Sequence, residues 1–258
     1  MFAHERHQTI LDTLQKRSPL TVPELEKILN ASPATVRRDL TFLEKIGKII
    51  RTHGGVLHPD HVQGEISFDR KSRAALNAKI ALATEAAALA KAGDTVFVDA
   101  GTTTLEVGRR LLEIDGLTIF TNSIPLLNER SGGAGRAGAR LVALGGEVRS
   151  VSLALVGSGA LEWVNRIRPD IAFLGASGID ATGGPCTTEL FEAEVKSAVI
   201  ARASRSVLLA DASKWEKTAA IRYADWSQVH DVFTNRTPDK SIRTRLAQNN
   251  VKLHVVTK

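Results

Sequence analysis

Apolar side chains in the first fifty residues recur at the spacing of short amphipathic helices. Ile10, Leu11 and Leu14 predict a first helix over residues 3–16, with one apolar face turned toward a core. Pro19 ends this helix, because the residue before a proline is pushed out of the helical region. The chain is therefore expected to begin with a helix that packs through one face.

A second helix start follows within a few residues. Thr21 and Glu24 have the spacing of a capping box, in which the threonine hydroxyl accepts from the glutamate amide and the glutamate reaches back. Leu25, Ile28 and Leu29 are then expected together on one apolar face. The pattern predicts a short second helix that packs through these three side chains.

A third helix begins after only a short turn. Ser32 is a favourable N-cap, and Pro33 suits the first helical position. Val36, Leu40 and Leu43 then follow at the spacing i, i+4, i+7. This spacing predicts a stripe that packs inward.

The opposite face of this third helix carries small, hydroxyl-bearing or cationic side chains. Two short helices with a tight turn, the second with a polar and basic outer face, are typical of a helix-turn-helix, whose second helix enters the major groove of DNA. The alternative is an ordinary helical bundle whose charged face is only solvated. On the first interpretation, the residues expected to contact DNA from this helix are Ser32, Ala34, Thr35, Arg37, Arg38 and Thr41.

A hairpin is predicted directly after the third helix. Two short β-prone runs, at residues 48–51 and 56–57, flank the sequence THGG at 52–55. A hairpin in this place would be the wing of a winged helix-turn-helix. Arg51 and His53 are then expected close to DNA phosphates.

The same residues resemble the N-terminal signature of DeoR-type transcriptional regulators. The matching positions are Arg6, Ile10, Leu14, Ser32, the run TVRRDL at 35–40 and the run RTHGG at 51–55. The resemblance implies a winged helix-turn-helix that binds double-stranded operator DNA. It continues through nearly the whole chain.

The pattern divides the chain into two domains and a linker. Residues 1–58 form the expected DNA-binding domain, and residues 59–75 are polar with few apolar anchors, as in an interdomain linker. Phe68 is the candidate docking residue within this linker. Residues 76–258 form the expected effector-sensing domain, where the pattern changes to alternating helices and strands.

The second domain is predicted to be an α/β fold. Its strands are short and uniformly apolar, which is typical of a mostly parallel sheet covered by helices on both faces. The expected strands are 95–98, 117–120, 140–143, 171–174, 206–209, 229–233 and 252–256. The expected helices are 76–91, 103–112, 124–129, 158–164, 188–203 and 239–248.

Polar, glycine-containing loops follow the carboxyl ends of these strands, where ligands of such sheets bind. After the first strand, backbone N–H groups at a helix start, with threonine hydroxyls, can hold a phosphate. Asp99 is expected to accept from a sugar hydroxyl, and the Lys214 ammonium to meet an anionic group. The residues expected to bind an effector are Asp99, Gly101, Thr102, Thr103, Thr104, Asn122, Gly145, Gly146, Arg149, Gly175 and Lys214.

Each of these features also has an ordinary structural explanation. The Gly-Thr-Thr sequence at 101–103 can be only a helix cap, and Lys214 can be only a surface charge. Glu192, Glu194 and Lys196 can form an ordinary charged helix face. The convergence of several such loops on one sheet edge is what favours a ligand site.

Six motifs of the second domain resemble the sensor domain of DeoR-type regulators, which is similar in fold to ribose-5-phosphate isomerase. They are DAGTT at 99–103, TNS at 121–123, LGGEVR at 144–149, DIAFLGASGID at 170–180, EAEVK at 192–196 and DASK at 211–214. The resemblance implies a phosphorylated sugar, or a similar metabolic intermediate, as effector. The sequence departs from the family pattern in a glycine-rich insert at 131–139 and in Trp215.

Composition narrows the class of protein. The net charge of +6 favours a polyanionic partner, and the apolar fraction of 43% is ordinary for a chain that buries a core. No apolar run reaches the length of a membrane span, about 18 residues, and the N-terminus has no signal-peptide pattern. Cys186 is the only cysteine and has no His/Cys cluster near it, so neither a disulfide nor a metal site is expected. We therefore expect a cytoplasmic protein without a cofactor, a metal or a membrane contact.

These features together predict a sequence-specific transcriptional regulator, a repressor of a carbohydrate operon that a phosphorylated metabolite controls. One small winged domain binds DNA weakly, so a homodimer or homotetramer is expected. The alternatives are a sugar-phosphate isomerase with an accessory DNA-binding domain, which would draw on Asp99, Glu192 and Lys214, and a structural nucleoid-type DNA binder. The isomerase leaves the helix-turn-helix unexplained and the nucleoid binder leaves the ligand-edge loops unexplained, so no catalytic residue is expected.

Overall fold

The computed structural model describes residues 2–17, 19–52, 55–57, 67–130 and 138–257. The chain falls into two compact units, Met1–Ser67 and Phe68–Lys258. The boundary lies before the domain start expected at residue 76, because the residues just after it form a helix, α4 (Phe68–Arg73), that packs within the second unit. Phe68 is 8% exposed and joins the core of that unit, so its predicted docking role is confirmed.

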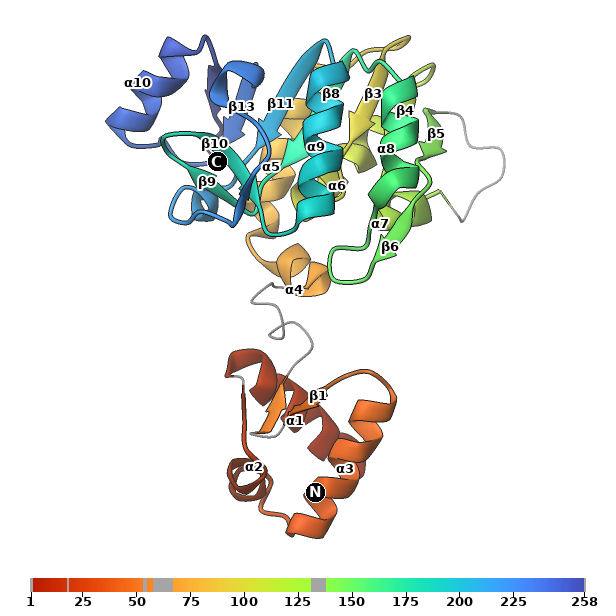
Figure 1. Cartoon of the computed structure of the whole chain (residues 1–258), viewed down its shortest axis with the longest axis vertical. Coiled ribbons are helices and arrows are strands. Elements are labelled where there is room, and N and C mark those ends of the chain that lie inside the picture. The colour runs from red at the N-terminus through yellow and green to blue at the C-terminus, as the bar shows by residue number, and fades with distance from the viewer. Residues whose placement is uncertain (1, 18, 53–54, 58–66, 131–137, 258) are drawn as a thin grey trace. The chain divides into compact units, whose positions relative to one another are not determined.

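In its described part, the N-terminal unit contains three helices and a hairpin (Figure 1). Its elements are α1 (Ala3–Lys16), α2 (Val22–Leu29), α3 (Pro33–Lys45), β1 (Ile50–Thr52) and β2 (Gly55–Leu57). The predicted caps are present, since Thr21 accepts from the Glu24 amide and Ser32 accepts from the Thr35 amide. The predicted helix-turn-helix and wing are confirmed.

The core of the N-terminal unit collects apolar side chains from its three helices and its hairpin. Val36, Leu40 and Leu43 of α3 are almost completely buried, as their spacing predicted. Ile28 is 43% exposed, so the prediction that it shares the buried face of α2 is wrong. This two-turn helix buries only Leu25 and Leu29, and Ile28 faces outward.

The hairpin is joined to the segment between α1 and α2. β1 and β2 pair in antiparallel register, with Arg51 opposite Val56. The backbones of Val56 and Leu20 exchange two hydrogen bonds, of 2.7 and 3.0 Å. A Cβ atom at Gly55 would lie 2.5 Å from the Leu20 carbonyl oxygen, so glycine is required where the hairpin passes this segment.

The second unit is built on a seven-stranded parallel sheet with the order β14-β13-β11-β8-β3-β4-β5. The strands are β3 (Thr95–Val98), β4 (Thr118–Thr121), β5 (Arg140–Ala143), β8 (Ile171–Gly175), β11 (Arg205–Leu209), β13 (Asp231–Thr234) and β14 (Lys252–Val255). Each lies within two residues of a predicted strand. The predicted α/β class is confirmed.

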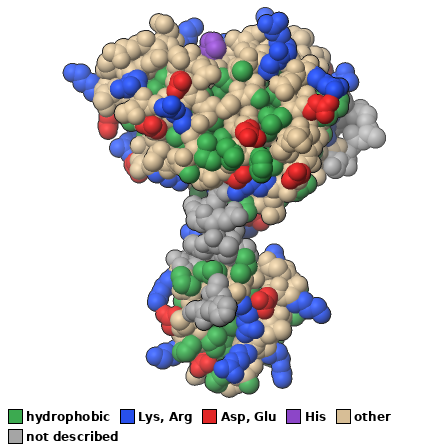
Figure 2. All heavy atoms as spheres, viewed as in Figure 1, with side chains coloured by type: hydrophobic (Ala, Val, Ile, Leu, Met, Phe, Trp, Pro, Cys, Tyr) green, Lys and Arg blue, Asp and Glu red, His purple; other side chains and the backbone are tan. Residues whose placement is uncertain are grey.

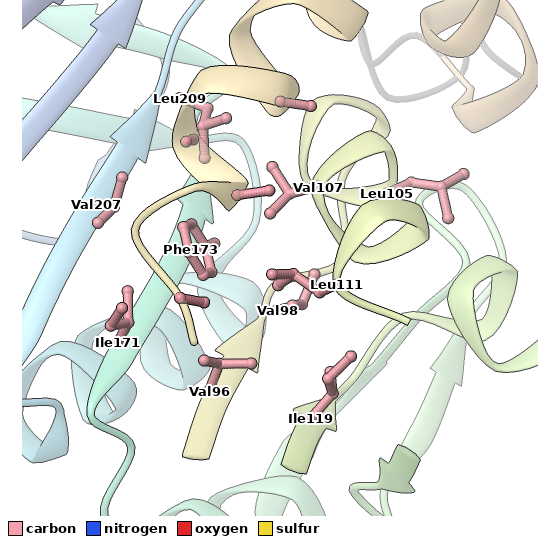
Figure 3. Close-up of a cluster of buried hydrophobic side chains, with 14 of the residues drawn as sticks. Val96, Val98, Leu105, Val107, Leu111, Ile119, Ile171, Phe173, Val207 and Leu209 are labelled. Carbon is pink, nitrogen blue, oxygen red and sulfur yellow. The ribbon is translucent and has the colours of Figure 1, made fainter. Parts of the chain in front are cut away.

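Helices cover both faces of this sheet (Figure 1). They are α5 (Leu76–Ala87) and α6 (Thr102–Leu111) on one face and α8 (Gly157–Arg166) and α9 (Leu190–Arg202) on the other. Val96 and Val98 of β3 face the first pair, and Figure 3 shows them packed against α6, whereas Phe97 faces the second pair. The strand is uniformly apolar because both of its faces are covered.

Short elements complete the second unit. They are α7 (Ile124–Asn128), β6 (Glu147–Arg149), β7 (Ala154–Val156), β9 (Gly178–Asp180), β10 (Gly184–Thr187), β12 (Ile221–Arg222) and α10 (Lys240–Gln248). The antiparallel strands among them were not predicted, because runs of two to four residues carry too little pattern to show a period. Residues 131–137 of the predicted glycine-rich insert lie outside the described residues.

Candidate functional site

The outer face of α3 is open to solvent. Ala34, Arg37, Arg38 and Thr41 are all exposed. Among the described residues, Arg37 and Arg38 have no ion-pair partner. Figure 2 shows Lys and Arg side chains over the visible face of this unit. The two arginines are thus available to a polyanion.

The start of α3 and the hairpin carry the remaining predicted DNA contacts. The hydroxyls of Ser32 and Thr35 lie 2.9 Å apart, and Ser32 Oγ accepts from the Thr35 amide at 3.3 Å. Arg51 is exposed, with Nη1 3.9 Å from Glu44 Oε2. His53 lies outside the described residues.

An ion pair fixes α3 to α1. Asp39, on the inner side of α3, is 4% exposed and accepts from Arg6 Nε at 2.7 Å and Nη2 at 3.1 Å. His7 Nε2 lies 3.0 Å from the same carboxylate. Burial raises the pKa of Asp39, but the hydrogen bonds from Arg6 and His7 outweigh it, so the pKa lies below its ordinary value. The orientation of the exposed arginines therefore depends on a buried carboxylate.

At the carboxyl edge of the sheet, hydrogen bonds join the loops that follow β3, β4 and β8. The Ala100 amide donates to Asn122 Oδ1 at 2.9 Å, and the Gly175 amide donates to Asp99 Oδ2 at 3.1 Å. Asn122 Nδ2 donates to the Leu155 carbonyl at 3.3 Å. The fold thus brings together three of the predicted effector residues, Asp99, Asn122 and Gly175.

The start of α6 presents free backbone donors. Gly101 is its N-cap and offers no side chain, and the amides of Thr102, Thr103 and Thr104 have no acceptor among the described residues. The Thr104 hydroxyl already donates to the Asp99 carbonyl at 2.7 Å, so it shapes the loop. What remains for a ligand is a set of amides at the positive end of a helix dipole.

A buried ion pair lies beside this loop. Asp99 and Lys196 are 1% and 4% exposed, and the Lys196 ammonium contacts Asp99 Oδ2. Lys196 also donates to the Gly175 carbonyl at 3.2 Å, and the Tyr223 hydroxyl donates to the same carbonyl at 2.8 Å. Burial raises the pKa of Asp99 and the Lys196 ammonium opposes that shift. The carboxylate expected to meet a sugar hydroxyl is therefore engaged through Oδ2 by an ammonium and an amide.

Arg149 is positioned by side chains from α9 and its own hairpin. Its Nη1 donates to Glu192 Oε1 at 2.9 Å and to Ser152 Oγ at 3.1 Å. Glu192 Oε2 accepts from Thr187 Oγ1 at 3.0 Å, and Glu192 is only 7% exposed. Glu192 and Lys196 are thus buried groups that position site residues, so the interpretation of both as part of an ordinary charged face is wrong.

The loop between β5 and β6 requires glycine. Gly146 has a φ of +135°, and a Cβ atom there would lie 2.5 Å from the Val156 carbonyl oxygen. A Cβ atom at Gly145 would make an ordinary contact with Trp163, 3.5 Å away. Gly146 therefore allows the close approach of this loop to β7.

Lys214 lies in a short 3₁₀ turn after β11, capped by Asp211. Its side chain is half-buried and forms no hydrogen bond with the described residues. Burial lowers its pKa to about 8, while Asp211 opposes the shift and neighbouring lysines add to it. Lys214 is the cation that the sequence analysis predicted to meet an anionic ligand at the carboxyl edge of the sheet.

Sequence reasoning missed Tyr223 and Lys79 as members of this edge. Tyr223 is 4% exposed, and burial raises the pKa of its hydroxyl well above the ordinary value. Lys79 is also 4% exposed, although it is a lysine. The available signal was weak: Lys79 is the only charged residue in the run ALNAKIALAT at 75–84.

Metal-ligand clusters and membrane-spanning helices are both absent from the described part of the chain. No cluster of three or more His, Cys, Asp or Glu side chains there could hold a metal ion. No helix there has the length and apolar composition needed to cross a membrane.

Two family models match this chain, one in each of its two units. Residues 6–62 match the model of the DeoR-like helix-turn-helix domain, and residues 74–236 match the model of the DeoR C-terminal sensor domain. The chain belongs to the DeoR family. It is a DNA-binding transcriptional regulator with a sensor domain and not an enzyme. The resemblance seen in the sequence motifs is confirmed.

Named relatives match this DeoR-family chain over nearly its full length. The glycerol-3-phosphate regulon repressor of Escherichia coli is 30% identical over 97% of this chain and 98% of the relative. The transcriptional repressor GlcR of Bacillus subtilis is 32% identical over 99% of this chain and 97% of the relative. The regulator GlpR of Haloferax volcanii is 32% identical over 95% of each.

A solved structure is similar over half of the chain. Ribose 5-phosphate isomerase A from Methanocaldococcus jannaschii matches 53% of this chain and 52% of its own, with 21% identity and a TM-score of 0.35.

Proposed function

We propose that this DeoR-family regulator is a repressor whose operator binding is controlled by a phosphorylated sugar, or a related phosphorylated metabolite, bound at the carboxyl edge of the parallel sheet. The observation that carries the proposal is the start of α6, where three amides without an acceptor among the described residues lie next to a neutralised carboxylate. The printed names of the relatives, one of them a glycerol-3-phosphate regulon repressor, support the same class of effector.

The electrostatics of this edge are suited to a phosphate. The first turn of α6 supplies N–H donors and the positive end of the helix dipole. Asp99 begins the same loop, and its negative charge would repel a phosphate if it were unpaired. The Lys196 ammonium compensates that charge, so a dianion can approach the threonine amides.

The neighbouring strand ends supply groups for the rest of the ligand. β11 lies next to β8 in the sheet, and Lys214 follows its carboxyl end with no hydrogen-bond partner among the described residues. Asn122 lies on the loop after β4, and Arg149 ends β6, the strand that follows β5 in the chain. We infer that these groups, with Gly175, contact the sugar part of the effector.

On the DNA side, α3 enters the major groove and Arg37 and Arg38 meet phosphates or base edges. A single winged unit makes too few contacts for specific binding, so two half-sites about one helical turn apart, or a multiple, are bound by a homodimer or homotetramer. The protein acts in the cytoplasm, where operator DNA is accessible. An effector releases the operator only if it binds the DNA-free arrangement more tightly.

A thermal-shift panel tests this function. The full chain is heated with glycerol 3-phosphate, glucose 6-phosphate, fructose 1-phosphate and ribose 5-phosphate, each beside its unphosphorylated form. A ligand at a hundred times its Kd stabilises the folded state by about 2.7 kcal/mol. A response to a phosphorylated compound alone, with release of operator DNA, supports the proposal; no response to any of them contradicts it. Conversion of a sugar phosphate in the same tubes would favour the isomerase alternative.

A further inference from the structure

A hollow of about 230 Å³ lies at the amino edge of the parallel sheet. It forms where β11, β13 and β14 begin, three strands that are neighbours in the sheet (Figure 1). The effector is proposed to bind at the opposite edge, beyond the carboxyl ends of the strands, and the two sites share no residue. This hollow, called the amino-edge hollow below, is lined by Ser204, Arg205, His230, Asp231, Asn250 and Lys252.

A buried carboxylate fixes the arginine of this hollow. Asp231 is 1% exposed, and it accepts from Arg205 Nε at 2.7 Å and from Nη2 at 2.9 Å. His254 Nε2 lies 2.8 Å from Asp231 Oδ1, and the His254 ring stacks on Phe233 with the ring centroids 4.2 Å apart. The hydrogen bonds from Arg205 and His254 hold the pKa of Asp231 below its ordinary value, although burial opposes them. Both oxygens of this carboxylate are therefore occupied.

Arg205 keeps part of its guanidinium for a ligand. A guanidinium carries five N–H donors in one plane, and Asp231 uses two of them, on Nε and Nη2. The N–H groups that are left, on Nη1 and Nη2, have no acceptor among the described residues. The Arg205 side chain is 34% exposed, so solvent and solutes reach it. The outer end of the guanidinium can thus bind two oxygens of one anion.

His230 adds a donor whose identity is set by the backbone. The Ser206 amide donates to His230 Nδ1 at 3.1 Å. Because an amide N–H only donates, Nδ1 is the acceptor nitrogen of the ring and Nε2 carries the proton. Within the described ranges, Nε2 has no hydrogen-bond partner. His230 therefore presents an N–H donor at the amino-edge hollow.

The segment that leads into β14 supplies two further polar side chains. Lys252 lies opposite Asp231 in the strand register, is exposed and forms no ion pair with the described residues. Asn250 has a φ of +58°, a left-handed conformation that asparagine adopts more readily than most residues. Its side-chain amide also has no partner in the described part of the chain. The hollow thus combines two cations with one carboxylate whose oxygens are already used.

The ion pair between Asp231 and Arg205 orients donors more than it stabilises the fold. Burying a carboxylate costs desolvation free energy, and pairing it with a partly exposed arginine recovers only part of that cost. The pair does hold the guanidinium in one orientation, and the Ser206 amide holds the His230 ring in the same way. Donors that are already fixed lose less conformational entropy when a ligand binds. The amino-edge hollow is therefore preorganised for an acceptor.

We propose that the amino-edge hollow is a second ligand site, which binds a phosphate group independently of the effector edge. The outer end of Arg205 binds two phosphate oxygens, and Lys252 and His230 Nε2 bind the others. Donors on three strands favour phosphate over a carboxylate, because a tetrahedral group presents oxygens in more directions than a planar one. Pockets for drug-sized ligands span about 300–1,000 Å³, so this smaller hollow fits inorganic phosphate or the phosphate end of a small ester.

The test follows amide chemical shifts of the full chain by nuclear magnetic resonance during titration. The probes are inorganic phosphate, glycerol 3-phosphate and succinate, each against chloride at equal ionic strength. Shifts at 204–206, 230–231 and 250–252 report the amino-edge hollow, and shifts at 101–104 report the effector edge. Lys252→Gln removes a lining cation, and Lys240→Gln removes an exposed lysine of α10 outside the hollow as the matched control. Arg205→Lys keeps a charge beside Asp231 but removes the planar end of the guanidinium.

We expect inorganic phosphate to shift the amides of the amino-edge hollow in the unaltered chain and in Lys240→Gln. In Lys252→Gln and in Arg205→Lys the affinity at this site should fall by about 5-fold or more, as for loss of a charge-assisted hydrogen bond. An equal response to glycerol 3-phosphate would identify a phosphate ester as a ligand, and a response to inorganic phosphate alone would identify the free ion. A Kd weaker than about 10 mM, or equal affinity in Lys252→Gln and Lys240→Gln, overturns the site. Succinate that binds as tightly as phosphate overturns the assignment to phosphate, and shifts at 101–104 alone leave the effector edge as the only anion site.

Discussion

Arg6 on α1 forms a bidentate ion pair with Asp39 on α3. Its Nε lies 2.7 Å from Oδ2, and its Nη2 lies 3.1 Å from Oδ1. The two residues are 33 positions apart, and Asp39 lies on the inner side of the helix that presents Arg37 and Arg38 outward. The pair therefore sets the rotation of the DNA-facing surface relative to α1. Removing Asp39 takes away the buried carboxylate that both Arg6 and His7 contact.

Asp39→Ala should destabilise the N-terminal unit and weaken operator binding. Loss of one partner of a fully buried ion pair costs about 3 kcal/mol in unfolding free energy, and the partial solvent exposure of Arg6 lowers the cost here. Urea denaturation followed by helical circular dichroism measures it. Asp12→Ala removes an equal charge from an exposed site of α1 and serves as the control. Equal stability of the two variants would mean that the ion pair contributes little.

The contribution of Asp39 should also depend on pH. Arg6 and His7 hold the folded-state pKa of Asp39 below its ordinary value, although burial opposes them. A depressed carboxyl pKa gives stability that is present above the unfolded-state value, about 3.9, and is lost as pH falls through the folded-state value. The stability difference between the unaltered chain and Asp39→Asn should therefore be constant near neutral pH and shrink below about pH 4. A difference that grows on acidification would contradict this sign.

Arg37→Ala should weaken operator binding by about 1–3 kcal/mol if the side chain reads a base, because a bidentate contact is lost. If Arg37 meets a phosphate instead, binding should weaken for all sequences and the salt slope should fall by about 1. Fluorescence anisotropy between about 50 and 200 mM salt separates the two. Lys240→Ala, an exposed cation of α10, is the control for net charge. Unchanged affinity in Arg37→Ala would exclude this face of α3.

Thr103→Asp should abolish the response to phosphorylated effectors while operator binding survives. The added carboxylate would sit beside the free amides of α6 and repel a phosphate. Because Thr103 is 7% exposed, the half-buried Thr102→Asp provides a second variant that perturbs packing less. Thr244→Asp, on exposed α10, is the control. Induction retained in both loop variants would place the phosphate elsewhere.

Affinity for an anionic effector should fall as pH rises through about 8, where Lys214 loses its proton. Phosphate monoesters remain dianionic above their second pKa, about 6, so the ligand charge is constant in this range. Titration calorimetry between about pH 7 and pH 9.5 measures the effect. Lys214→Arg, which stays charged, should flatten the profile. A flat profile in the unaltered chain would remove Lys214 from the anion site.

Much of the structure of this protein could be predicted from the sequence, because it depends on interactions between residues close together in the chain. The caps at Thr21 and Ser32 and the buried stripe of α3 depend on residues three to seven positions apart, so their pattern is legible in the chain itself. Uniformly apolar runs likewise indicated a sheet covered on both faces. The sheet in turn predicted that the glycine-containing loops lie together, because parallel strands end at a common edge.

Packing between distant segments decided the rest. Asp99 and Lys196 are separated by 97 positions, and neither the burial of this pair nor its contact with Gly175 has a sequence period that could reveal it. The outward position of Ile28 depends on which neighbours α2 meets, although its spacing favoured the core. Lys79 became a buried cation only because α4 folds back to offer it a carbonyl. Periodicity records which face of an element is apolar, whereas the partner of a polar group is fixed only when segments far apart in the chain come into contact.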